Sequence, residues 1–125
     1  MVTRPCPCGT GLAYDGCCGP LHAGAPASTA LALMRSRYSA FARADAAYLA
    51  ATWHPGTVPD AVDVDAGVRW TGLEIFDVVA GGPGERRGTV EFVARYREDG
   101  VAHELHERSR FVRQSDRWWY LDGRG

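Results

Sequence analysis

The spacing of apolar residues predicts two helices in the first half of the chain. Apolar side chains recur at three- and four-residue intervals, the period of one helix face, at Leu31, Met34, Tyr38 and Phe41. Ser28 or Thr29 is suited to cap the start of this helix. Asp45 is suited to cap a second, shorter helix after a bend. That helix should end at His54-Pro55, because a residue that precedes proline disfavours helical backbone.

After residue 67 the apolar residues become β-branched and aromatic, and their period shortens to two, which predicts strands. The four predicted strands are residues 67–80, 87–98, 101–114 and 117–123. Short turn sequences such as "EDG" and "QSD" separate them, so we expect an antiparallel meander. Helices followed by a meander predict an α+β fold, in which the helices pack on one face of a curved sheet. The segment 56–67 should be a loop with at most a short edge strand.

Composition and charge narrow the class of protein. Apolar residues make up 46% and charged residues 23% of the 125 residues, as in a typical globular domain. The formal net charge is −1, and every basic residue is Arg. Bulk nucleic-acid binding needs a basic surface that releases phosphate counterions, so we do not expect it. We find no signal-peptide core and no apolar run long enough for a membrane span, so we expect a cytoplasmic protein without membrane contact. The oligomeric state stays open.

The cysteines have the spacing C-x-C-x8-C-C and all precede residue 19. They are Cys6, Cys8, Cys17 and Cys18. Four thiolates suit tetrahedral zinc, and the glycines beside them permit a tight backbone. A reducing cytoplasm favours metal binding over disulfides. Because this Pro- and Gly-rich segment has no apolar core of its own, metal binding would also explain how it folds. We therefore favour a structural Zn²⁺ site.

Two other roles for the thiols stay open. Adjacent Cys17 and Cys18 can form a strained disulfide, so a redox-active dithiol is one alternative, although no neighbouring His or Lys lowers a thiol pKa. Unmetallated free thiols are the other. His22 lies four residues after Cys18 and is a possible replacement ligand. Since four thiols are already present, we expect His22 to be a bystander.

Two sets of motifs resemble known families. "CPCGTGLAYDGCC" is similar to the SEC-C motif, whose four ligands bind zinc and which serves as a docking element for a partner protein or the ribosome. "LMRSRYSAF", "YLAATWHP", "ERSRF" and "WWYLDG", in this order after the motif, resemble the bacterial YchJ family. The resemblance implies an N-terminal zinc knuckle over residues 1–24. It also implies a nuclear transport factor 2-like domain over residues 28–125, a cone in which helices pack in the concave face of a curved antiparallel sheet. The loop between the cysteine pairs lacks the lysines frequent in SEC-C motifs, which weakens the case for ribosome contact.

Such a cone implies a cavity lined by aromatic residues with a few polar groups, as in small-molecule sites generally. The candidate lining residues are Trp53, His54, Trp70, Phe92, Tyr96, Glu107 and Ser109. A buried carboxylate needs a partner, which Arg35 or Arg37 can supply by closing the pocket with an ion pair. Three interpretations stay open: a structural Arg–Glu pair, a ligand pocket with Glu107 or His54 as acid or base, and a Glu107 that faces solvent.

Three hypotheses of function follow. The leading one is a non-enzymatic adaptor whose zinc knuckle docks a protein partner. The second is a small-molecule-binding or enzymatic cavity that uses Glu107 or His54, with the zinc site structural. The third is a thiol redox protein. Familiar catalytic motifs such as G-x-S-x-G, the P-loop and H-E-x-x-H are absent, so we assign no catalytic residue and leave enzymatic activity open.

Overall fold

The computed structural model describes residues 4–124; residues 1–3 and 125, which the predicted domain ranges include, lie outside the described residues. Short helices come first and four long strands follow. The elements are η1 (Tyr14–Gly16, a 3₁₀ turn), α1 (Gly19–His22), α2 (Ala30–Ala42), α3 (Ala46–Ala51), β1 (Arg69–Ala80), β2 (Arg87–Glu98), β3 (Val101–Gln114) and β4 (Arg117–Arg124). The predicted α+β class is confirmed. No helix among residues 4–124 combines the length and apolar character that crossing a membrane requires.

The predicted caps define α2 and α3. The backbone N–H of Ala32 donates to Thr29 Oγ1 at 3.0 Å, and that of Tyr48 donates to Asp45 Oδ1 at 3.1 Å. Between the two helices Ala44 adopts a left-handed backbone, with φ of 55°, which produces the bend. The second helix ends at Ala51, earlier than predicted, because the chain beyond it pairs with β4 instead.

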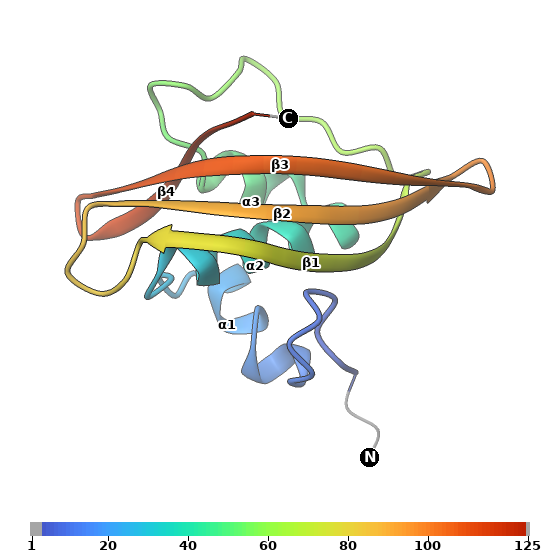
Figure 1. Ribbon diagram of the computed structural model, residues 1–125, viewed down its shortest axis with the longest axis horizontal. Coiled ribbons are helices and arrows are strands. Elements are labelled where there is room, and N and C mark those ends of the chain that lie inside the picture. The colour runs from blue at the N-terminus through green and yellow to red at the C-terminus, as the bar shows by residue number, and fades with distance from the viewer. Residues whose placement is uncertain (1–3, 125) are drawn as a thin grey trace.

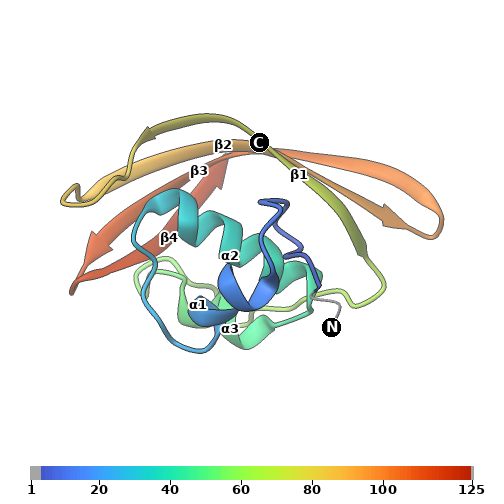
Figure 2. The ribbon, with the colours of Figure 1, turned by 90° about the horizontal axis from the view of Figure 1, so that it is seen from below.

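The strands form one antiparallel sheet in the order β1-β2-β3-β4, the predicted meander (Figure 1). Register shifts interrupt the ladder twice between β1 and β2 and once between β3 and β4. Such irregularities bend strands and increase their twist. The resulting sheet arches over the helices, which lie against its concave face (Figure 2). The segment 56–67 contains no strand.

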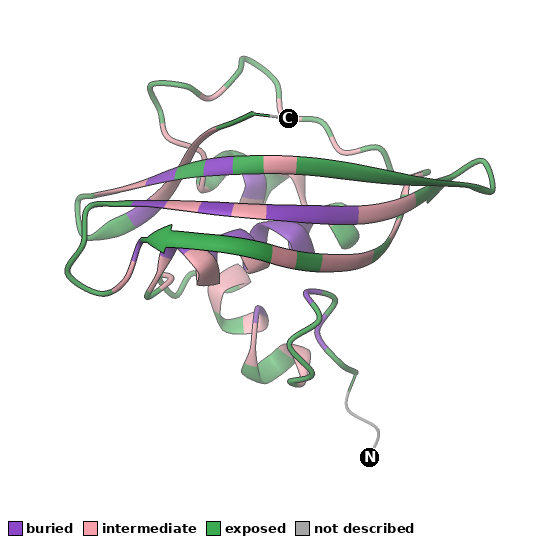
Figure 3. Cartoon of the chain, viewed as in Figure 1, coloured by how far each residue is buried: buried purple, intermediate pink, exposed green. Residues whose placement is uncertain are grey.

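Helix α2 lies between the sheet and the N-terminal segment, and this position explains its burial on several sides (Figure 3). Its buried residues are Ala30, Leu33, Met34, Ser36, Arg37, Tyr38, Ser39 and Ala40. Large side chains such as Tyr38 share the core with sheet residues such as Phe92. The small residues Ser36, Ser39 and Ala40 allow close approach on other sides of the helix.

Candidate functional site

The four predicted metal ligands lie together. The Sγ atoms of Cys6, Cys8, Cys17 and Cys18 all lie within 4.8 Å of one another, and Cys17 alone is not fully buried. Those of Cys8 and Cys17 are 3.6 Å apart, much further than a disulfide bond of about 2.05 Å. A tetrahedral site with metal–sulfur bonds of about 2.3 Å has sulfur–sulfur edges of roughly 3.8 Å. The donor set and its spacing therefore fit a tetrahedral metal ion.

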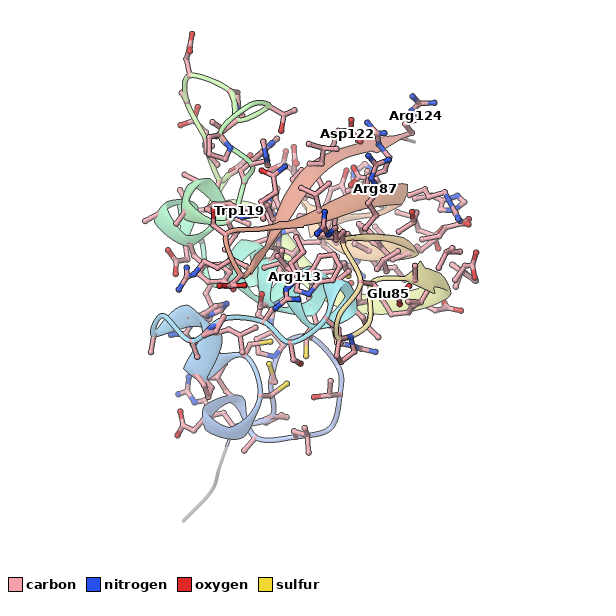
Figure 4. The ribbon with its side chains drawn as sticks, turned by 90° about the vertical axis from the view of Figure 1, so that its left-hand side faces the viewer. Glu85, Arg87, Arg113, Trp119, Asp122 and Arg124 are labelled. Carbon is pink, nitrogen blue, oxygen red and sulfur yellow. The ribbon has the colours of Figure 1, made fainter. Side chains whose placement is uncertain are left out.

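Two left-handed glycines shape the loop that follows the first cysteine pair. Gly9 and Gly11 have φ of 82° and 84°, a region that side-chain-bearing residues rarely adopt. The turn is closed by the Cys6 N–H, which donates to the Leu12 carbonyl at 2.8 Å. The second cysteine pair lies between η1 and α1, which fix it against the first. Figure 4 shows sulfur atoms gathered where the N-terminal segment meets the helices.

Four thiols this close cannot all ionise without a counter-charge. Hydrogen bonding with Cys18 lowers the pKa of Cys8 to about 4, and the same hydrogen bond raises the pKa of Cys18. Burial raises the pKa of Cys17. A divalent cation would supply the missing positive charge and hold the ligands as thiolates.

The cysteine cluster packs directly on α2. Arg35 Nη1 donates to the Cys8 carbonyl oxygen at 2.9 Å, and Cys6 Sγ lies 3.4 Å from Ser39 Oγ. Three of the cysteines belong to the same apolar cluster as the side chains of α2 and the sheet. The core is therefore continuous from the candidate metal site to the sheet.

His22 joins the N-terminal segment to α2 by both ring nitrogens. Nε2 lies 2.8 Å from the Ser36 carbonyl oxygen, which can only accept, so Nε2 carries the proton. Nδ1 then accepts from the Tyr14 hydroxyl at 2.7 Å. The ring also packs against Tyr48, with centroids 4.5 Å apart. His22 is outside the sulfur cluster, and its contacts give it a structural role that we did not predict.

Replacing His22 with Ala should lower the free energy of unfolding by about 2 kcal/mol, because two hydrogen bonds and an aromatic contact are lost. Urea denaturation measures this change. The comparison is His103→Ala, which removes an exposed stacking contact with Tyr96 but no hydrogen bond of residues 4–124, and should cost less than about 1 kcal/mol. Equal effects of the two substitutions would show that His22 does not join the segments.

A cavity of about 240 Å³ lies between α2 and the concave face of the sheet. Five of the predicted pocket residues line it: Trp53, Trp70, Phe92, Glu107 and Ser109. Two do not. His54 is half-buried and lies outside the cavity, with Nε2 2.8 Å from Gln114 Oε1. Tyr96 packs between Trp70 and His103. A second cavity, of about 320 Å³, is lined by Leu21, Tyr48 and Trp118 among others.

The predicted Arg–Glu ion pair is not formed. Arg35 lies on the other side of α2 and binds the Cys8 carbonyl. Arg37 does line the cavity, but Nη1 donates to the Leu49 carbonyl at 2.8 Å and to Thr52 Oγ1 at 2.7 Å. No carboxylate of residues 4–124 lies within 4.0 Å of either guanidinium. Their acceptors are a turn carbonyl of the N-terminal segment for Arg35 and a carbonyl and a hydroxyl at the end of α3 for Arg37. A sequence pattern does not reveal such acceptors.

Glu107 instead accepts hydrogen bonds from two hydroxyl groups on the concave face of the sheet. Its Oε2 accepts from Ser109 Oγ at 2.5 Å and from the Tyr120 hydroxyl at 3.3 Å. Burial and the nearby carboxylate raise the pKa of Tyr120 to about 12. Gly123, across from Ser109, leaves the carboxylate room, since a Cβ there would collide with it.

Tyr120 is one of several cavity residues that the predicted pocket set did not include. Its ring lies 4.3 Å from the guanidinium carbon of Arg37 and packs edge-on to Trp53. The alternation of "RWWYLDG" places Tyr120 on the same face as Trp118, which is buried. That alternation was the available signal for an inward-facing Tyr120.

Comparison with known proteins agrees with this architecture. The family model described as "YchJ, middle NTF2-like domain" matches residues 29–123. The chain is 54% identical to a UPF0225 protein of Streptomyces coelicolor, over 98% of this chain and 97% of that protein. It is 50% identical to a UPF0225 protein of Deinococcus radiodurans, over 95% of this chain and 88% of that protein.

Two solved structures have a similar fold. The solution structure of a SEC-C motif containing protein from Rhodopseudomonas palustris has a TM-score of 0.78 and 36% identity, and the match covers 98% of both chains. The crystal structure of a SEC-C motif containing protein from Psychrobacter arcticus has a TM-score of 0.76 and 30% identity, with 95% of this chain and 81% of that chain covered. With its cysteine cluster, its curved sheet packed on helices and these relatives, the chain belongs to the YchJ (UPF0225) family.

Proposed function

We propose that the protein is a zinc-dependent adaptor whose knuckle, residues 4–24 of the described chain, docks a partner protein. The observation that carries the proposal is the closed set of four sulfur donors. Four protein ligands complete a tetrahedron and leave no open position for water or substrate, which is typical of structural zinc. The ion would then maintain the shape of the knuckle and take no part in catalysis.

Zinc is the metal that this donor set favours. Zn²⁺ accepts four thiolates in tetrahedral geometry and has no redox chemistry of its own. The short turns of the knuckle contain few apolar residues, so coordination would contribute much of the free energy that orders them. A metal-ordered loop loses little conformational entropy when it binds a partner.

The outer surface of the knuckle offers an apolar anchor. Leu12, between the two cysteine pairs, is 56% exposed, and the neighbouring residues Gly9, Thr10 and Gly11 are exposed as well. In Figure 1 the N-terminal segment projects below the edge strand β1, and Figure 2 shows it beside the helices. The knuckle is thus accessible to a partner while its inner face rests on α2.

The charge distribution supports a protein partner over a nucleic acid. On the outer face of the sheet, Arg95, Arg108 and Arg110 each form an ion pair with a carboxylate. Along the side seen in Figure 4, the basic side chains are interspersed with the acidic residues Glu85 and Asp122. Nucleic-acid binding depends on unpaired basic groups that contact phosphates.

Leu12→Asp should abolish capture of the partner while the protein stays folded and zinc-loaded. The test is a crosslinking pulldown from cells that encode the protein, with zinc content measured for every variant. Val101→Asp is the matched control, because Val101 is also 56% exposed but lies at the start of β3, outside the knuckle. Proteins lost with Leu12→Asp and retained with Val101→Asp would support docking through the knuckle. Identical partner sets for both variants and the wild type would refute it.

A further inference from the structure

The 240 Å³ cavity has a wall that is almost entirely apolar and a small polar region. Aromatic and aliphatic side chains form most of the lining, among them Met34, Tyr38, Phe41, Trp70 and Phe92. Leu105, 41% exposed, also lines it, so the cavity reaches the surface beside β3. An apolar cavity with a few converging polar groups is the usual form of a small-molecule site.

Arg37 places a buried positive charge at this cavity, and some of its N–H donors have no hydrogen-bond partner in the described part of the chain. The residue is 6% exposed, and its guanidinium stacks on Tyr120. Nη1 makes both of its hydrogen bonds, so Nε and Nη2 donate to no group of residues 4–124. Among residues 4–124, Trp53 Nε1 is the sole side-chain nitrogen or oxygen that is both fully buried and without a hydrogen-bond partner. Nε and Nη2 of Arg37 have no partner among these residues, so neither of them is fully buried. These donors are therefore available to a molecule in the cavity.

Glu107 brings the matching acceptor. Both of its hydrogen bonds end on Oε2, so Oε1 accepts from no group of residues 4–124. Arg37 and Glu107 are the two charged side chains that line the cavity, and they lie too far apart to form an ion pair. Burial lowers the pKa of Arg37 to about 10, and the charge of the Glu107 carboxylate partly offsets this effect. The polar region thus carries donors and an acceptor but no net charge.

We propose that this cavity binds a neutral aromatic carboxamide, with the amide oxygen accepting from Arg37 and the amide N–H donating to Glu107. A carboxylate ligand would be repelled by Glu107, and an ammonium ligand by Arg37. A neutral amide carries an acceptor and a donor on two atoms bonded to the same carbon, so it can form hydrogen bonds with both side chains. The aromatic wall accommodates a ring by edge-to-face and offset contacts.

Benzamide, benzoate and benzylamine test this assignment, because they share a ring and differ in the charge of the polar group. Each is titrated into the full-length, zinc-loaded protein while the indole N–H signals are followed by NMR. Benzamide should bind roughly tenfold more tightly than either charged probe, since neither side chain then faces a like charge. Trp53 and Trp70 line this cavity and should shift; Trp118 and Trp119 should not. Tighter binding of a charged probe, equal binding of all three, shifts confined to Trp118, or no saturable binding would each overturn the proposal.

Glu107→Gln should reverse the ranking. Without the carboxylate the cavity keeps the charge of Arg37, so benzoate should bind more tightly than benzamide. Glu104→Gln is the matched control: Glu104 lies on the same strand, faces outward and pairs with Arg95, so the wild-type ranking should persist. An unchanged ranking in Glu107→Gln contradicts the proposal. The wild-type series decides the matter by itself if that variant fails to fold.

Discussion

Replacing Cys18 with Ser is expected to reduce bound zinc well below stoichiometric and to destabilise the whole chain, not the knuckle alone. Cys18 is 2% exposed and belongs to the core cluster that also contains Leu33, Tyr38 and Phe92. A serine hydroxyl is a poor zinc ligand, and its burial without the metal carries a desolvation penalty. Loss of a structural metal is among the few single changes that cost more than about 4 kcal/mol.

The measurement combines zinc analysis by mass spectrometry with urea denaturation followed by tryptophan fluorescence. Asp15→Asn is the matched control within the knuckle, because Asp15 is exposed and its side chain makes no hydrogen bond with residues 4–124. This variant should keep its zinc and lose less than about 0.5 kcal/mol. Chelation of wild-type zinc should reproduce the effect of Cys18→Ser. Wild-type protein that contains no zinc and has four freely titrating thiols would refute the metal site and restore the free-thiol interpretation.

The strands were predictable because their signal is local. Alternation and turn chemistry lie within each segment, and three of the four predicted strands begin at the residue where the structure begins them. The same alternation correctly placed Glu107 and Ser109 inside and His106 and Arg108 outside. The four cysteines were predictable as a cluster because their own spacing brings them together.

Contacts between distant segments were not predictable. The partners of Arg37 are an acceptor at the end of α3 and the ring of Tyr120, and neither is marked by a pattern near residue 37. His54 carries no local sign that its partner is Gln114, sixty residues away. The side of α2 that holds the knuckle was also unforeseen, since Ser36 and Ser39 resemble solvent-exposed positions in sequence. The contacts of these residues depend on how distant segments pack together, and that packing is defined only by the complete fold.

The first turn of helix α2 approaches the sheet closely at Gly81 and Gly88, in addition to the shared apolar core. This contact concerns both candidate sites because α2 separates them. The Ala30 N–H donates to the Gly81 carbonyl at 2.9 Å, where the helix begins. A Cβ at Gly88 would lie 2.6 Å from Gly81 Cα and 2.9 Å from Ala30 Cβ. The first contact is with backbone, which cannot rotate away. Glycine at position 88 is therefore required where the β1–β2 connection meets the first residue of α2.

Gly88→Val should accordingly lower the free energy of unfolding by about 3 kcal/mol, because the added side chain pushes α2 away from the sheet. Gly72→Val is the matched control, since a Cβ at Gly72 meets nothing within 4 Å and the strand favours a β-branched residue. The stability of Gly72→Val should change by less than about 0.5 kcal/mol.

Urea denaturation combined with zinc analysis separates the effect of Gly88→Val from that of Cys18→Ser. Gly88→Val should keep its zinc, because the cysteines rest on Arg35 and Ser39, further along α2. Loss of zinc in Gly88→Val would mean that the sheet contact also holds the metal site together, and equal stability of the two glycine variants would refute the close approach.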